Sequence, residues 1–171
     1  MHPLMDLYAY NDWANAQVFA TCRDVDQARL DEQAPGTYGT LSDTLKHLIQ
    51  VEAVYLRMLR EQPLASRESQ AAQAEIRDFL AHDLPWFADL QAQIGRAYSD
   101  LVAHATDAWY AEPLPVPWFD FALTKQDGLL QVLSHSSQHR AQVFSVLGER
   151  GAVVPNIDYV FFLQSKLPSG A

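Results

Sequence analysis

Three histidines stand at spacings that suit a metal site. His135 and His139 are four residues apart in the segment His135-Ser-Ser-Gln-His139, and on an α-helix this spacing places both imidazoles on one face. His47 lies in a separate segment, Thr44-Leu-Lys-His-Leu-Ile-Gln-Val-Glu52. If the two segments are neighbouring helices, three imidazoles converge on one ion. Three protein nitrogens with an open fourth position are the pattern of a reactive metal site, whereas structural sites usually have four protein ligands.

The histidine pair differs from two better-defined metal motifs. Ser136 follows His135, so the glutamate that acts as general base in the His-Glu-x-x-His motif is missing. The chain also has no Glu-x-x-His element, two of which a di-iron carboxylate site requires. Three neutral imidazoles suit zinc, nickel, iron or copper, and sequence does not choose among them. The competing interpretation is that the histidines bind nothing and are satisfied by hydroxyls such as those of Thr44, Ser134 and Ser136.

Other polar residues near these segments have simpler interpretations. Asp43 lies one turn before His47 and could orient its ring or act as a base, but we prefer a first-turn carboxylate favoured by the helix dipole. Glu52 is expected at the surface or in an interface. Cys22 has no basic neighbour in sequence to lower its pKa and is expected to be inert. The remaining histidines have no partner at ligand spacing and are expected to be ordinary, partly exposed residues: His2, His82 and His104.

Four long segments with helical spacing of apolar residues must position these side chains. They cover about residues 4–23, 40–60, 83–105 and 124–149, and they predict an all-α four-helix bundle. His47 lies on the flank of the second apolar stripe, whereas His135 and His139 lie on the fourth. Asn11 and Asn15 fall on or beside the first stripe, so they either line a polar cavity, sit at its edge, or face water.

The connections between these segments carry their own signals. We expect a link over residues 24–39 that includes a short helical turn around 27–32. We also expect a loop over residues 61–69 and a helix over residues 71–82. Residues 107–123 contain three prolines among several aromatic residues, which forbids a continuous helix. This segment is expected to be an ordered crossover packed on the bundle, or a lid over a pocket. Residues 156–163 are strongly apolar and are expected to form a short helix that packs on the bundle or on a partner subunit.

The composition limits the classes of function. The 171 residues are expected to form one domain over 1–171, with 12 Lys and Arg against 21 Asp and Glu, a net charge of −9. This acidic balance argues against nucleic-acid binding. The single cysteine rules out an intramolecular disulfide, and neither a signal-like N-terminus nor an apolar stretch of membrane-spanning length is apparent. We expect a cytoplasmic protein with no membrane contact.

Several short motifs together resemble the DinB/YfiT-like family. They are Tyr10-Asn-Asp-Trp-Ala-Asn15, Thr44-Leu-Lys-His-Leu48, His135-Ser-Ser-Gln-His-Arg-Ala-Gln142, and Pro155-Asn-Ile-Asp-Tyr159 followed by Phe161-Phe-Leu163. They occur in the family's order and span nearly the whole chain. The resemblance implies a bundle of up-down-down-up type with a long crossover. It also implies homodimers and one divalent metal ion per chain, commonly nickel or zinc with iron as a further candidate, bound by His47, His135 and His139.

Characterised relatives of this kind include metal-dependent transferases and isomerases that use low-molecular-weight thiols such as bacillithiol or mycothiol. We therefore expect a metal-dependent enzyme of thiol S-transferase-like or hydrolase-like type, acting on a small molecule, with such a thiol as a candidate partner. Tyr8, Asn11 and residues 118–121 are candidate pocket walls. The alternative is a non-catalytic metal-binding module for stress response or protein interaction. An accessible cavity of several hundred cubic ångströms beside the metal would favour the enzyme.

Overall fold

The computed structural model describes residues 2–62, 64 and 69–168, and the regular structure of these residues is helical. Four long helices confirm the predicted segments to within a few residues: α1 (Pro3–Arg23), α3 (Leu41–Leu59), α5 (Leu84–His104) and α7 (Lys125–Glu149). Shorter helices lie between or after them: α2 (Gln27–Leu30), α4 (Gln70–Leu80), α6 (Asp107–Ala111) and α8 (Tyr159–Ser165). The loop predicted over 61–69 includes residues 63 and 65–68, which lie outside the described residues.

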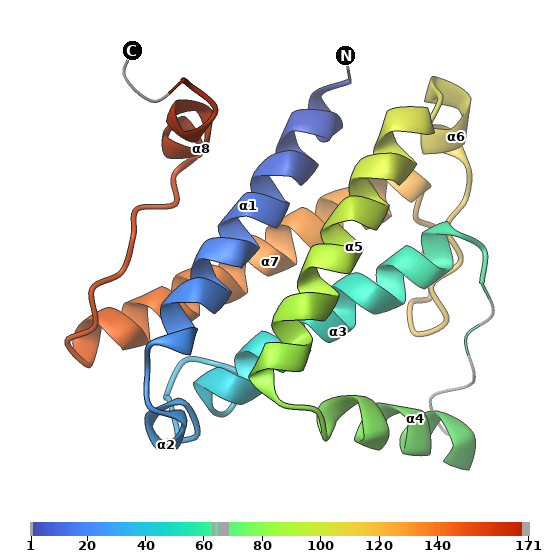
Figure 1. The fold of residues 1–171 in the computed structure, drawn as a ribbon. Coiled ribbons are helices and arrows are strands. Elements are labelled where there is room, and N and C mark those ends of the chain that lie inside the picture. Colours follow the sequence, from blue (N-terminus) through green and yellow to red (C-terminus); the bar gives the residue numbers. More distant parts are fainter. Residues whose placement is uncertain (1, 63, 65–68, 169–171) are drawn as a thin grey trace.

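The four long helices form a bundle in which each contacts two others. The contacting pairs are α1 with α5, α5 with α3, α3 with α7, and α7 with α1. In Figure 1, α1 and α7 run in one direction while α3 and α5 run in the other. The predicted up-down-down-up arrangement is therefore confirmed, and α3 and α5 are parallel neighbours.

The long crossover lies in a different place from the one predicted. Because α3 and α5 are parallel, the chain must return along the bundle between them, and α4 lies in this return (Figure 1). Residues 107–123 instead join antiparallel α5 and α7 at one end of the bundle. After α6 they form a hairpin closed by the Leu114 N–H, which donates to the Leu123 carbonyl at 2.8 Å. The sequence-based prediction was wrong because proline content marks a break in a helix but not the direction of the next one.

Both helices that carry the three histidines begin with the same capping arrangement. The Thr40 hydroxyl accepts from the Asp43 amide at 3.0 Å, and the Asp43 carboxylate accepts from the Thr40 amide at 3.2 Å. Thr124 and Asp127 make the equivalent pair at the start of α7. Such reciprocal bonds satisfy backbone donors that have no partner within the helix. The preferred interpretation of Asp43 as a first-turn carboxylate is confirmed.

The C-terminal helix α8 packs on α1, as predicted for the apolar segment. Tyr10 donates from its hydroxyl to the Ile157 carbonyl at 2.9 Å, and its ring meets those of Tyr159 and Phe162. The large hydrophobic residues of α8 that stay exposed are Tyr159, Val160, Phe161 and Leu163. The homodimer stays a prediction.

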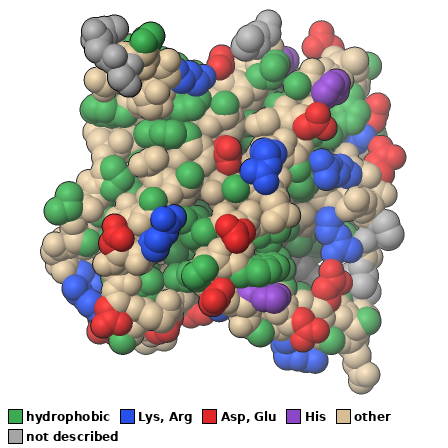
Figure 2. Space-filling view, in the orientation of Figure 1, with side chains coloured by type: hydrophobic (Ala, Val, Ile, Leu, Met, Phe, Trp, Pro, Cys, Tyr) green, Lys and Arg blue, Asp and Glu red, His purple; other side chains and the backbone are tan. Residues whose placement is uncertain are grey.

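The surface and the helix composition give two further observations. On the face shown in Figure 2, acidic and basic side chains are interspersed among apolar ones, and no continuous basic area forms there. Within the described part of the chain, every helix is too short or too polar to cross a membrane.

Removing the Thr124 hydroxyl tests the contribution of the capping box. We expect Thr124→Ala to lower the free energy of unfolding by about 1 kcal/mol because the Asp127 amide loses its acceptor. Urea denaturation followed by circular dichroism measures this change. Thr124→Ser keeps a hydroxyl and should retain most of the stability. Equal midpoints for all three proteins would mean that the cap contributes nothing measurable.

Candidate metal centre

The structure brings the three predicted histidines together. His47 from α3 and His135 and His139 from α7 form a group in which one ligand nitrogen of each lies within 4.8 Å of the others. The Nε2 atom of His135 lies 3.2 Å from Nε2 of His47 and 3.1 Å from Nε2 of His139. The neighbouring helices α3 and α7 thus place three imidazole nitrogens around one point.

These nitrogen separations fit a divalent ion. Zinc binds imidazole nitrogen at about 2.0–2.1 Å, so two nitrogens of a tetrahedral site lie about 3.3 Å apart. The observed 3.1 and 3.2 Å are close to that value. A neutral imidazole nitrogen either donates or accepts a hydrogen bond, so three converging Nε2 atoms are poorly matched to one another and well matched to a cation. The donor set therefore fits a metal.

Burial keeps His135 in the form that binds metals. Desolvation, followed by the proximity of His139 and His47, lowers the pKa of His135 to about 3. Desolvation also lowers the pKa of His139, although its hydrogen bond to Gln142 opposes this shift. At neutral pH the two rings are neutral and each offers a lone pair, which metal coordination requires.

Gln142 fixes the orientation of His139. The Nδ1–H group of His139 donates to Oε1 of Gln142 at 2.7 Å, which leaves the lone pair on Nε2, the atom that faces the other histidines. Gln142 is itself held, since its Nε2 donates to the Gly36 carbonyl at 2.7 Å. Sequence reasoning did not single out Gln142, although its position three residues after His139 on one helix was the available signal.

The ring of His47 is supported from the loop before α3. The Tyr38 ring stacks on it with centroids 3.9 Å apart and planes within 7°. The Tyr38 amide in turn donates to the Thr44 hydroxyl at 3.0 Å, so the aromatic ring is tied to the helix that carries His47.

A buried polar cluster lies behind the histidines and joins three helices. Oε1 of Glu52 on α3 accepts hydrogen bonds from Asn11 and Asn15 on α1, both at 2.9 Å, and from the Ser136 hydroxyl on α7 at 2.6 Å. Arg140 on α7 completes the cluster by donating to the two asparagine side-chain carbonyls at 2.6 and 2.7 Å. Ser136 and Arg140 each follow a histidine by one position, so the cluster fixes the part of α7 that carries His135 and His139.

The structure corrects the expected position of Glu52 and decides between the alternatives for Asn11 and Asn15. Glu52 was predicted at the surface or in an interface, which is wrong, because only 2% of its surface is exposed. It occupies the inward stripe of α3 between Leu48 and Tyr55, and this register was the signal for its burial. Asn11 and Asn15 are buried as well, so they belong to the polar interior and do not face water.

One cavity contacts the histidine group, and a larger one is lined by α3, α7 and the hairpin that precedes α7. The smaller, of about 170 Å3, is lined by His47 itself together with these residues: Tyr38, Asp43, Lys46, Gln50 and Leu80. The larger, of about 350 Å3, has walls from α3, α7 and the 112–124 hairpin: Tyr55, Phe119, Phe121, Leu123, Asp127, Leu130, Gln131 and Ser134. Ser134 precedes His135 directly on α7, so the wall of this cavity and the histidine group share one helix.

The sequence profile of the DinB family matches residues 1–170. The chain belongs to the DinB family. A solved structure with the same fold is YfiT from Bacillus subtilis, described as a probable metal-dependent hydrolase with an unusual four-helix bundle topology. The two share 17% sequence identity over 90% of this chain and 91% of YfiT, with a TM-score of 0.71. No curated protein matches the sequence.

The other residues singled out in this DinB chain lie away from the histidines. Tyr8 is not a pocket wall: it is buried in the core, where its ring stacks on Tyr98 and its hydroxyl donates to the Leu129 carbonyl. Cys22 is buried too, and burial raises the pKa of its thiol to about 12, which fits inert packing. The three remaining histidines stay outside the group: His2 caps α1, His82 stacks on Trp86, and exposed His104 contacts Asp100.

Loss of the Gln142 acceptor should weaken metal binding. We expect Gln142→Leu to lower the zinc affinity of the DinB chain by about 10- to 100-fold, because the His139 ring loses the bond that fixes its tautomer. Competition with a chromophoric chelator measures the affinity. Gln142→Glu keeps an acceptor at this position and should stay within a few-fold of the wild type. Unchanged affinity in Gln142→Leu would contradict the proposed orientation of His139.

Truncation of Glu52 should destabilise the bundle. We expect Glu52→Ala to lower the free energy of unfolding by about 3–5 kcal/mol, since it leaves three buried donors without their acceptor and the buried Arg140 without its counter-charge. Glu52→Gln retains Oε1 and should cost less. Urea denaturation measures both, with the exposed Glu149→Ala as a control expected within about 0.5 kcal/mol of the wild type. A small effect of Glu52→Ala, equal to that of the control, would show that the cluster does not hold the helices together.

Proposed function

We propose that this DinB chain is a metal-dependent enzyme that acts on a small molecule, with hydrolysis as its reaction type. The observation that carries the proposal is the convergence of three imidazoles, in which Nε2 of His135 lies 3.2 Å from Nε2 of His47 and 3.1 Å from Nε2 of His139. The likeness in fold to YfiT, described as a probable metal-dependent hydrolase, supports it.

The roles of the residues follow from their positions. His47, His135 and His139 hold the ion, and nickel or zinc is the proposed metal. A divalent ion with three protein ligands and one open position lowers the pKa of bound water and polarises a substrate oxygen. Gln142 keeps the His139 lone pair directed at the ion, and the Glu52 cluster maintains the rotation of α7 about its axis. Asp43 is occupied by the helix cap and is not assigned as a base.

The cavities favour an enzyme over a binding module. A non-catalytic metal module needs no space for a substrate, whereas the larger cavity of about 350 Å3 falls within the usual range for small-molecule sites. Thiol transfer, the other reaction expected for such a site, would use the same open position with a thiol in place of water. The two reactions are separated by assays with and without an added thiol.

The proposal is tested with protein purified without an affinity tag, beside the double variant His135→Ala/His139→Ala. We expect nearly one nickel or zinc ion per wild-type chain and none in the variant. After reconstitution with zinc, hydrolysis of 4-nitrophenyl acetate should be faster in the wild type by about 100-fold or more, because the variant cannot hold the ion. Transfer of cysteine to 1-chloro-2,4-dinitrobenzene is measured in parallel.

The control for folding is His104→Ala, which removes an exposed histidine outside the group and should leave metal content unchanged. Wild-type protein that binds no metal even after reconstitution would overturn the proposal. Full metal loading with neither hydrolysis nor thiol transfer would favour the non-catalytic module.

A further inference from the structure

The larger cavity has an apolar lining that the fold leaves uncovered. Three of its residues expose large apolar side chains, Phe119 by 41%, Phe121 by 59% and Leu130 by 44%. The rings of Phe119 and Phe121 stack on each other with centroids 4.9 Å apart. Apolar surface gathered in one concave place on a protein commonly marks a binding site.

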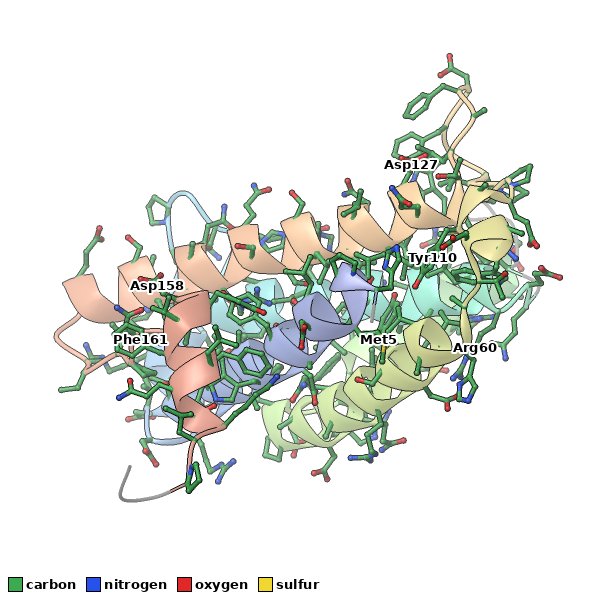
Figure 3. All side chains as sticks on the ribbon, turned by 90° about the horizontal axis from the view of Figure 1, so that it is seen from above. Met5, Arg60, Tyr110, Asp127, Asp158 and Phe161 are labelled. Atoms are coloured by element: carbon green, nitrogen blue, oxygen red, sulfur yellow. The ribbon has the colours of Figure 1, made fainter. Side chains whose placement is uncertain are left out.

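The aromatic pair is held in position by the base of the hairpin. Leu114 and Val116 are buried, and the Phe119 amide donates to the Val116 carbonyl at 3.1 Å. Leu114 packs directly against Gly128, where a side chain would collide with it. In Figure 3 this segment stands out from the bundle beside Asp127, next to the start of α7. The two rings therefore form a wall beside α7 that is fixed at its base.

The cavity lies along the same two helices that carry the histidine group. Gln131 and Ser134 line it on α7, and Gln131 lies one helical turn, about 6 Å along the axis, before His135. Tyr55 lines it on α3, the helix that carries His47. The polar members Gln131 and Ser134 lie closest in sequence to the metal ligands, whereas the aromatic members come from the hairpin.

The charges around the cavity favour one chemical class of occupant. Its lining includes Asp127 but, among the described residues, neither lysine nor arginine. Hydrogen bonds from Thr124 hold the pKa of Asp127 below its usual value, so this carboxylate is negative at neutral pH. An anionic tail would be repelled here, whereas an uncharged apolar group meets aromatic and aliphatic walls.

We propose that this cavity binds the uncharged aromatic or alkyl part of the substrate, whose polar reactive group lies at His47, His135 and His139. This inference rests on the proposed function, because it takes the histidine group as the reactive end of the site. The substrate is then a neutral compound with an apolar body, which a spacer long enough to cross one helical turn links to its reactive group.

Hydroxamic acids test the inference because they chelate zinc while their tails can be varied. The affinities of zinc-loaded protein for three compounds are measured by isothermal titration calorimetry. Acetohydroxamic acid has almost no tail, 4-phenylbutyrohydroxamic acid carries an aromatic tail, and glutaric monohydroxamic acid carries a carboxylate. We expect the phenyl tail to tighten binding by roughly tenfold or more over acetohydroxamic acid. The carboxylate tail should give no gain.

Leu130→Glu places a charge in the cavity at an already exposed position. It should abolish the advantage of the phenyl tail and leave the affinity for acetohydroxamic acid unchanged. Val153→Glu, a matched change at a residue that is 94% exposed in the link to α8, should alter neither. Equal affinities for the phenyl and acetyl compounds, or a phenyl advantage that survives Leu130→Glu, would overturn the inference.

Failure of the proposed function would look different. If zinc-loaded protein bound no hydroxamate at all, the assignment of the histidine group would be wrong. The cavity is then tested without metal, by NMR titration with 4-phenyl-1-butanol. Amide shifts confined to Gln131, Ser134 and the hairpin would support an apolar site, and their absence would overturn it. A monomer–dimer shift in Leu130→Glu without any effect on these ligands would assign the patch to subunit contact and also overturn the inference.

Discussion

The bundle depends on one buried oxygen atom. Oε1 of Glu52 accepts hydrogen bonds from two helices other than its own, through Asn11, Asn15 and Ser136. A buried carboxyl group without partners is very costly, so α1, α3 and α7 can pack closely only in the arrangement that supplies these donors. Apolar side chains tolerate small rotations of a helix, but this set of directional bonds does not. The polar cluster thus selects one rotation of α7 among those that the apolar core would permit.

The positions of the histidines depend on this fixed rotation of α7. Ser136 and Arg140 are the residues directly after His135 and His139, and each is hydrogen-bonded into the cluster. Fixing these two neighbours fixes the directions of the two imidazoles. His47 lies five residues before Glu52 on α3, so the third histidine of the group lies on the same helix as the carboxyl group at the centre of the cluster. The hydrogen bonds behind the histidines are rigid, and open space lies beside His47. The shape of the site is therefore set before any ion or molecule binds.

Much of this arrangement was predictable from spacing. The apolar periodicity gave the four long helices, and the interval between His135 and His139 gave the shared face on α7. The hydrogen bonds that support the histidines were harder to predict, because sequence does not report which polar residue meets which. Glu52 was misplaced although it stands in register with Leu48 and Tyr55, since glutamate is rarely buried without a partner and its partners come from α1 and α7. The site of the crossover was missed for a related reason, because helix direction is decided by packing between distant segments.

The position of α7 as the last long helix has a consequence for the order in which the site forms during synthesis. His47 and Glu52 leave the ribosome early. Two of the three clustered imidazoles, and both α7 members of the polar cluster, belong to the last of the long helices. A nascent chain that ends before α7 holds a lone histidine and a carboxyl group that lacks its Ser136 and Arg140 partners. Closure of the bundle and assembly of the histidine group therefore wait for α7, and products that end before it have neither.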